Sequence, residues 1–249
     1  MSSSLADLPL VDAASLPALS RSQMAEVDRI AVEDFGLGLL QMMENAGLWL
    51  AETVRLFLGG SVARRRVVVV CGKGNNGGGG LAAARRLSIW GAAVTVLVTA
   101  PLEALAPGPA AQMRVLQRSA IPVQPFDGTL PVHDLLVDAI VGYNLRGALT
   151  GVAAAAVEGL NASGGGVIAL DFPSGVDADT GAARGPAVRA AATVTLALPK
   201  AGLLAESAHD LAGQVLLADI GIPNAVYRQA AIPPPAGAFS SGPLVRVRT

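Results

Sequence analysis

Two adjacent asparagines stand in a glycine-rich segment with few side chains, which follows an apolar run. Residues 67–80 read VVVVCGKGNNGGGG, so Asn75 and Asn76 lie among glycines directly after four valines and a cysteine. Glycines let backbone N–H groups approach a ligand closely, and the N-terminus of a following helix at Leu81 would favour an anion. A loop that merely turned tightly would not require two asparagines, so we interpret residues 72–80 as a binding loop.

Neither standard phosphate-binding motif fits this loop fully. Gly72 to Gly77 match G-x-G-x-x-G, but the acidic residue expected about 20 residues later is missing, since Glu103 comes late and displaced. A Walker loop would end in Gly-Lys-Ser/Thr, whereas this one ends in Gly79-Gly80. The loop therefore predicts ligand binding without identifying the ligand.

Two aspartates leave apolar, strand-like segments further along the sequence. Asp138 stands near the end of one such segment, and Asp171 directly follows another. A carboxylate at such a place is costly to bury without a partner. The alternative role is structural, the capping of a turn, which we assign to Asp177 and Asp179. For Asp138 and Asp171 we favour a functional role.

The elements that position these residues alternate regularly. Residues 22–58 carry apolar side chains at three- and four-residue steps, and Gly36 and Gly38 divide the pattern into two helices. Apolar strands without polar alternation then alternate with helices, which is typical of a mostly parallel sheet covered on both faces. The expected strands are 67–71, 93–98, 135–140, 167–170, 194–198 and 215–217, and the expected helices are 81–90, 107–118 and 151–162.

In such a sheet, the polar segments that follow the strands lie at the same edge. Ligands of open parallel sheets bind at the carboxyl ends of the strands, where loops lead into helices. We therefore expect Asp138 and Asp171 to converge on the asparagine loop. No repeat or internal linker is evident, so we expect one domain over residues 1–231. The proline-, glycine- and serine-rich tail 232–249 is expected to run irregularly over the surface.

Composition excludes several kinds of partner. The protein has 249 residues and a formal net charge of −1, which provides no basic surface for nucleic acid. The single cysteine, Cys71, excludes an internal disulfide and permits a reducing compartment. No signal-peptide pattern opens the sequence, and charges or glycines interrupt the apolar runs, so we expect a cytoplasmic protein without membrane contact.

Lysine is rare in this protein. Only two of the 18 basic residues are lysine, Lys73 and Lys200. A compact, flexible ammonium could be needed at these positions, or chance and GC-rich codon usage could explain the count. The sequence leaves both interpretations open.

Five motifs occur in the order seen in the NAD(P)H-hydrate epimerase family, the YjeF N-terminal-domain fold. They are GKGNNGG, VDAIVG, ALDFPSGVDADTG, TVTLALPKAGL and DIGIP, and the N-terminal SRSQMAEVDRIAVEDFGLGLLQMMENAG resembles the family's opening helix pair. The similarity spans roughly residues 20–227. It implies an α/β fold, a Rossmann-like three-layer αβα sandwich with a mostly parallel central sheet and an N-terminal helix pair, often as a homodimer.

The resemblance also implies an activity. Members of the family are isomerases that epimerise the damaged, hydrated cofactor NAD(P)HX (NADHX or NADPHX) in metabolite repair, with a bound potassium ion (K+). Inverting a hydroxylated ring carbon requires a group that can accept and return a proton near that carbon, and Asp171 is the candidate catalytic residue. A related nucleotide could also be the substrate. A second class of function is a non-catalytic nucleotide-binding or protein-interaction module on the same scaffold.

Site residues follow from the resemblance position by position. Asn76, Asp138 and Ser174 match the family's potassium ligands, and their oxygens suit a hard cation. The segment Gly142–Ala148 matches the loop around the substrate's phosphates, and Asp171 matches a substrate-contacting aspartate. The expected substrate-binding residues are Asn75, Asn76, Gly77, Gly78, Gly79, Gly142, Tyr143, Asn144, Leu145, Arg146, Gly147, Ala148 and Asp171.

Two departures from the family pattern fall in this site. The usual run G-N-N-G-G-D-G has Gly79 in place of the aspartate, and the usual Gly-Thr-Gly reads Gly142-Tyr143-Asn144 here. Tyr143 could stack on a base or only fill space, and Arg146 could pair with a phosphate or face solvent. A lost carboxylate beside a gained tyrosine and arginine predicts altered substrate handling on the family's fold.

Overall fold

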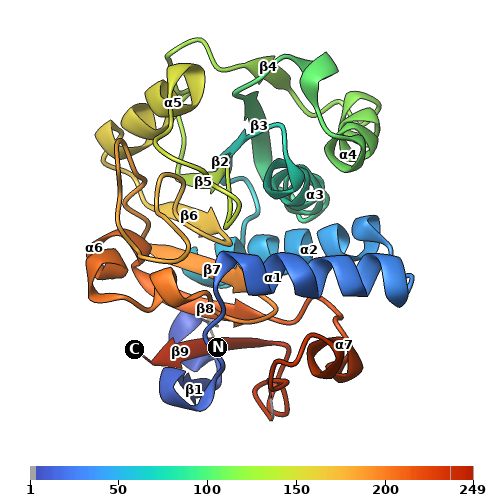
Figure 1. The fold of residues 1–249 in the computed structure, drawn as a ribbon. Helices are drawn as coiled ribbons and strands as arrows, with labels where there is room; N and C mark the ends of the chain where they lie inside the picture. Colours follow the sequence, from blue (N-terminus) through green and yellow to red (C-terminus); the bar gives the residue numbers. More distant parts are fainter. Residues whose placement is uncertain (1–3, 236, 249) are drawn as a thin grey trace.

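A nine-stranded sheet forms the centre of the computed structural model, which describes residues 4–235 and 237–248 (Figure 1). The strands are β1 (Leu10–Asp12), β2 (Arg66–Cys71), β3 (Ala93–Val98), β4 (Val123–Pro125), β5 (Leu135–Ala139), β6 (Val167–Leu170), β7 (Ala192–Leu196), β8 (Gln214–Ala218) and β9 (Leu244–Arg248). The helices are α1 (Arg21–Arg29), α2 (Leu39–Phe57), α3 (Asn75–Ile89), α4 (Pro107–Gln117), α5 (Gly151–Ala162), α6 (His209–Ala212) and α7 (Asn224–Gln229).

The strand order places a topological switch point in the middle of the sheet. The order is β1-β9-β8-β7-β6-β5-β2-β3-β4, and all neighbouring strands from β2 to β8 are parallel. The polypeptide runs outward from β2 to β4, returns to β5 beside β2, and then continues in the opposite direction. The loops after β2 and β5 therefore diverge, and this divergence leaves a crevice at their carboxyl ends.

Helices cover both faces of this sheet. Val67, Val69 and Cys71 pack in one core with apolar residues of α2 and α3, whereas Val68 and Val70 pack in a second core with residues of α5. Figure 1 shows α2, α3 and α4 on one side of the sheet and α5 on the other. Burial on both faces explains why β2 is apolar without alternation. The predicted Rossmann-like three-layer αβα fold is confirmed.

The N-terminal helix pair is also as predicted. A reciprocal capping box begins α1, since the Ser20 hydroxyl accepts from the Gln23 backbone N–H (3.2 Å) and the Gln23 side chain accepts from Ser20 N–H (2.8 Å). One π-helical stretch, Ile30–Asp34, extends α1, and Gly36 (φ +70°) then reverses the backbone toward α2. This hairpin forms one wall of the site described below.

Helix α3 begins earlier than the sequence predicts. We expected a loop over residues 72–80, but α3 starts at Asn75 and includes the glycine run. A Cβ at Gly78 would lie 2.4 Å from Met43 Sδ, and a Cβ at Gly80 would lie 2.5 Å from Ala139 Cβ. These glycines are therefore needed because α3 packs tightly against α2 and the sheet, and this packing overrides their low helix propensity.

The C-terminal segment is more ordered than expected. The prediction of an irregular tail is wrong for Leu244–Arg248, which form β9 between β8 and β1. Val245 and Val247 are buried, so the short run LVRVR has an apolar face to cover. The division of the protein after residue 231 stays a prediction. Residues 1–3, 236 and 249 lie outside the described residues. None of the described helices is long and apolar enough to cross a membrane.

Candidate active site

A cavity of about 910 Å³ lies at the carboxyl ends of β2, β5 and β6. The loops after these strands form its polar wall. The facing wall comes from α1, its π-helical extension and α2, and is mostly apolar but includes Asp28, Arg29 and Glu33. Its position is the switch point of the sheet, where ligands of this architecture bind. The lining residues used below are Met24, Asp28, Asn75, Asn76, Gly79, Gly142, Tyr143, Asn144, Asp171 and Lys200.

Asp171 occupies a strained position at the end of β6. Its φ is +64°, a region that residues with a side chain rarely adopt, and Phe172 N–H donates to Leu170 C=O over 2.8 Å across it. This three-residue turn ends the strand at the cavity. Backbone strain of this kind clusters at functional sites, where the surrounding structure holds it in place.

Lys200, itself part of the cavity wall, holds the Asp171 carboxylate. Lys200 Nζ donates to Asp171 Oδ1 (2.6 Å), Leu196 C=O (3.1 Å) and Thr195 Oγ1 (3.3 Å). The second carboxylate oxygen, Oδ2, accepts from the backbone N–H of Tyr143 over 2.8 Å. Both oxygens of Asp171 are thereby fixed in orientation. Of the two lysines, Lys200 is thus a buried ion-pair partner, whereas Lys73 is exposed.

Asp138 and Ser174 form a second buried polar pair. Asp138 Oδ1 accepts from the Ser174 hydroxyl (2.6 Å) and from Ile140 N–H (3.1 Å), and Oδ2 accepts from Ser174 N–H (2.7 Å). Burial raises the pKa of Asp138 to about 6, although the hydrogen bonds from Ser174 and Ile140 oppose this shift. Among the residues that the structure describes, Asp138 has no ion-pair partner.

Gly142 brings Asn76 close to Asp171. A Cβ at Gly142 would lie 2.5 Å from Asp171 Oδ2 and 3.0 Å from Asn76 Oδ1, so only glycine permits this approach. Next to it, Val141 N–H donates to the Ser174 hydroxyl over 3.0 Å. Residues 141 and 142 therefore join the Asp138–Ser174 pair to Asn76 and Asp171, and the predicted convergence of the three loops is present.

A cation fits this group of oxygens. Asp138 is a buried carboxyl without a cationic neighbour in contact among the described residues, and a buried carboxylate in this state requires a cation to compensate its charge. Asn76 Nδ2 is also buried without a hydrogen-bond partner within the described residues, but as a donor it requires an acceptor on a ligand, so only Oδ1 of this side chain can face a cation. Carboxylate, hydroxyl and amide oxygens are the donors that hard cations prefer. The residues present are therefore compatible with the potassium ion that the resemblance implies.

The predicted substrate residues are only partly in the cavity. Asn75, Asn76, Gly79, Gly142, Tyr143, Asn144 and Asp171 line it. Gly77 and Gly78, in the first turn of α3, instead pack against the protein: a Cβ at Gly77 would lie 1.9 Å from Gly72 O, and one at Gly78 would lie 2.4 Å from Met43 Sδ. Within the described structure, Leu145, Arg146, Gly147 and Ala148 do not line the cavity. Arg146 is exposed, which agrees with the solvent-facing interpretation.

Asp28 is a cavity residue that the sequence did not single out. It lies on α1 and accepts a 2.5 Å hydrogen bond at Oδ2 from the Tyr143 hydroxyl. The ring centroid of Tyr143 is 5.5 Å from Lys200 Nζ, so the tyrosine spans the site from the sheet edge to α1. The sequence does contain one indication that Asp28 faces inward. Asp28 falls four residues after buried Met24 and three before buried Ala31, within the apolar face of the helix.

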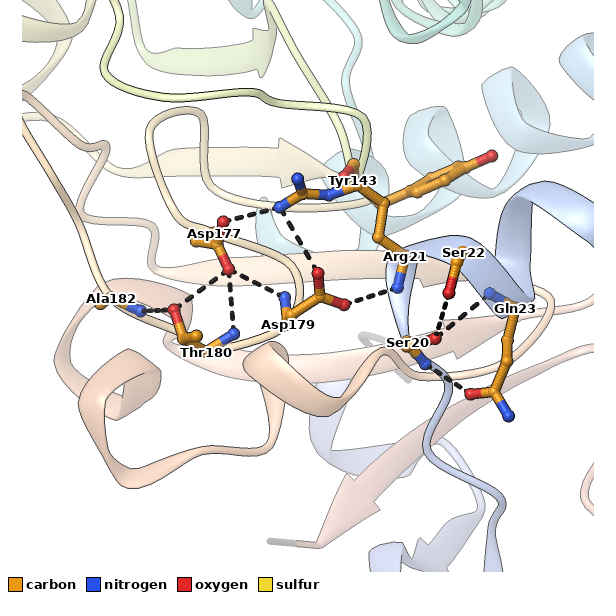
Figure 2. A network of polar contacts seen from close by, with 9 residues as sticks. All are labelled: Ser20, Arg21, Ser22, Gln23, Tyr143, Asp177, Asp179, Thr180 and Ala182. Atoms are coloured by element: carbon orange, nitrogen blue, oxygen red, sulfur yellow. Dashed lines mark hydrogen bonds and ion pairs between the residues drawn. The ribbon is translucent and has the colours of Figure 1, made fainter.

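Arg21 ties the start of α1 to Tyr143 and to the loop after β6 (Figure 2). Arg21 Nη2 donates to Asp177 Oδ2 (2.6 Å), and Arg21 Nε donates to the backbone carbonyl oxygen of Tyr143 (3.2 Å). Asp177 Oδ1 also accepts from Thr180 N–H (3.0 Å), so the predicted turn-capping role of Asp177 is confirmed. Burial alone would raise the pKa of Asp177, but hydrogen bonds from Arg21 and Thr180 outweigh burial and lower the pKa to about 2.

The fold and site together define a Rossmann-like α/β protein with a polar ligand cavity at the switch point of its sheet. More specifically, the protein belongs to the family described as YjeF-related protein N-terminus, whose family model matches residues 39–202.

Curated relatives of this protein have names that specify an activity. An NAD(P)H-hydrate epimerase of Dehalogenimonas lykanthroporepellens is 43% identical over 228 residues, which cover 90% of each of the two sequences. An NAD(P)H-hydrate epimerase of Rhodopirellula baltica is 33% identical, covering 92% of this protein and 94% of its own length. The crystal structure of yeast ynu0 is similar with a TM-score of 0.77 and 25% identity, covering 93% of this protein and 100% of the yeast one.

Proposed function

We propose that this protein is an NAD(P)H-hydrate epimerase, an isomerase that acts in metabolite repair by epimerising the hydrated nicotinamide cofactor NAD(P)HX. The near full-length similarity to proteins of that name supports the activity. The structural observation that carries the proposal is the Asp171 carboxylate. It is fixed by Lys200 and by Tyr143 N–H at the wall of a cavity that Asn75 and Asn76 also line.

Asp171 is the proposed catalytic residue. Epimerisation at a hydroxylated ring carbon requires a group that accepts and returns a proton near that carbon. The two hydrogen bonds at 2.6 and 2.8 Å hold Asp171 in one orientation, so the carboxylate is positioned before substrate binds. Asn75, Asn76, Gly79, Gly142, Tyr143 and Asn144 line the same cavity and are the proposed substrate contacts. A role of Leu145–Ala148 at the substrate's phosphates stays a prediction.

Asn76, Asp138 and Ser174 are the proposed holders of a potassium ion. When bound, the ion supplies a fixed positive charge beside the cavity and compensates the buried Asp138 carboxylate. The neighbouring residues keep their own roles: Ser174 fixes both Asp138 oxygens, and Gly142 keeps Asn76 and Asp171 close together. We further propose a homodimer in the cytoplasm with no nucleic-acid partner, from the family resemblance and the net charge of −1.

A non-catalytic binding module on the same scaffold is the alternative, and it is not favoured. Each of the relatives with a curated name described above is named as an epimerase. Incubating the purified protein with each separated epimer of NADHX and following both by chromatography distinguishes the two functions. An epimerase equilibrates the epimers, whereas a binding module shifts its own melting temperature with NADHX but leaves the epimer ratio at the uncatalysed rate.

A further inference from the structure

Tyr143 contacts two different carboxyl groups of the cavity. Its backbone N–H donates to Asp171 Oδ2 over 2.8 Å, and its hydroxyl donates to Asp28 Oδ2 over 2.5 Å. Asp171 comes from the end of β6 and Asp28 from α1, which forms the facing wall. The two carboxyl groups are therefore separated by the length of one tyrosine, with the cavity open to both.

The surroundings of the two carboxyl groups differ in charge. Asp171 has the Lys200 ammonium at 2.6 Å, whereas Asp28 forms no ion pair with any described residue. Burial raises the pKa of Asp28, and the charge of Asp171 adds to this, while the Tyr143 hydroxyl and Lys200 oppose it. A cavity that holds one carboxylate paired with an ammonium and one partly buried carboxyl group without a cation in contact can supply a base and an acid.

Asp28 also has an oxygen available for a ligand. The Tyr143 hydroxyl occupies Oδ2 only, and within the described residues Oδ1 accepts no hydrogen bond. Asp28 is a partly buried member of the cavity wall, so a substrate held between α1 and the sheet edge would meet it directly. Tyr143 keeps the carboxyl in place from one side and leaves the other side free.

We propose that Asp28 is a second catalytic residue, which donates a proton to the departing hydroxyl group while Asp171 takes a proton from the incoming water. The inference rests on the proposed epimerase function. In a hydrated dihydronicotinamide the hydroxyl stands on a carbon next to the ring nitrogen, because water adds to an enamine in that sense. Loss of this hydroxyl makes the carbon planar, and return of water to the other face inverts it.

Protons and electrons balance in this step. Protonated Asp28 gives its proton to the hydroxyl oxygen, the carbon–oxygen bond breaks with its electron pair on oxygen, and water is released. The ring nitrogen lone pair forms a double bond to the carbon. A water molecule then adds to the opposite face, its electron pair forms the new carbon–oxygen bond, and Asp171 takes the proton. Exchange with solvent returns both carboxyl groups to their starting states, and no oxidant or reductant takes part.

Asp28→Asn tests this role, with Glu26→Gln as the matched control. Glu26 lies on the same helix and pairs with Arg29, but it does not line the cavity. We expect Asp28→Asn to lower kcat about 100-fold with KM changed by less than about threefold, since general acid catalysis contributes on this scale. Glu26→Gln should keep the wild-type kcat.

A second variant covers the case in which Asp28→Asn does not fold. Asp28→Ala leaves space for a small acid, so added formate should restore part of its kcat, whereas formate should not restore Asp171→Asn. An active wild type with an unchanged kcat in Asp28→Asn would overturn the inference and leave the epimerase function standing. A slow Asp28→Ala that formate does not restore would overturn it as well. An inactive wild type would instead overturn the proposed function itself.

Discussion

Lys200 Nζ donates a 2.6 Å hydrogen bond to Asp171 Oδ1, and the two side chains are only 1% and 5% exposed to solvent. This buried ion pair stands where β6 and its neighbour β7 end, at the wall of the cavity. An ion pair in this environment tolerates loss of one partner poorly, because the other charge is left buried and uncompensated. Activity and stability are therefore linked at this pair.

Asp171→Asn should remove epimerisation and also destabilise the protein. From the sequence alone the isosteric change would leave the fold nearly unaffected, but the unpaired Lys200 ammonium should cost about 3–5 kcal/mol in the free energy of unfolding. Urea denaturation measures the loss. The double variant Asp171→Asn with Lys200→Met should recover stability without activity. A single variant as stable as the wild type would contradict the assigned ion pair.

Exchanging potassium for tetramethylammonium should lower the melting temperature of the wild type. The proposed site at Asn76, Asp138 and Ser174 excludes a bulky organic cation, so stabilisation by mass action is lost. Asp138→Asn should abolish this cation dependence, because the buried carboxylate is removed. Asp127→Asn is the matched control, since among the described residues the Asp127 side chain hydrogen-bonds only to Thr129, at the surface. Equal melting temperatures in both salts would show that no potassium ion binds at this site.

The cation effect should depend on pH in a definite direction. Burial raises the pKa of Asp138 to about 6 in the folded protein, above its value in the unfolded state. Without potassium, stability from this group is present below pH about 4 and is lost as the pH rises through about 6. Potassium binds the ionised carboxylate, so the melting-temperature difference between the two salts should be larger at pH 8 than at pH 5. A larger difference at pH 5 would contradict the site.

Gly79→Asp should leave epimerisation unchanged or impair it. A Cβ at Gly79 would lie 2.7 Å from Leu170 Cδ2, so the new side chain must displace a buried leucine at a cost of about 1–3 kcal/mol. The new carboxylate would also repel substrate phosphates. Gly79→Ala separates the crowding from the charge. An increase in epimerisation rate would show instead that the missing aspartate limits the wild type.

Arg21→Gln should destabilise the protein at neutral pH but not at low pH. The hydrogen bonds to Asp177 from Arg21 and Thr180 outweigh burial and lower its pKa to about 2. The stability that the Arg21–Asp177 pair provides is therefore present above pH about 4 and is lost as the pH falls toward about 2. The melting-temperature difference from the wild type should shrink over this range. Arg248→Gln, which breaks a more exposed pair with Asp12, should show almost no difference. A constant Arg21→Gln difference down to pH 2.5 would contradict the pairing.

Much of the sheet could be predicted because its central strands are buried on both faces. The expected strands 93–98 and 167–170 agree with β3 and β6 at both ends. The edge strands β1 and β4 and the strand β9 beside β1 were not predicted, since each is short and takes its strand conformation from a partner distant in sequence. Helix α3 was predicted to begin at residue 81, because close packing of Gly77–Gly80 overrides glycine's low helix propensity.

Those site residues could be predicted whose location follows from their position at the end of a strand. Asp138 and Asp171 leave neighbouring parallel strands, so their convergence follows from topology. Lys200 could not be assigned to Asp171 from the sequence, because 29 residues separate them and their contact depends on how β6 and β7 end. Asp28 belongs to a helix whose placement over the sheet edge depends on packing of the whole N-terminal hairpin. Local sequence patterns could therefore not predict its contact with Tyr143.

The most direct test compares the epimerisation rates of two proteins, the wild type and the double variant Asp171→Asn with Lys200→Met. The comparison decides whether this cavity epimerises NADHX through Asp171. Each separated NADHX epimer would be incubated with increasing amounts of protein in potassium buffer, and the ratio of epimers followed by chromatography. We expect wild type to bring both epimers to one common ratio at a rate proportional to protein concentration, while the folded double variant adds nothing to the uncatalysed rate. A wild type no faster than buffer, or a double variant as fast as wild type, would refute the proposed role of Asp171.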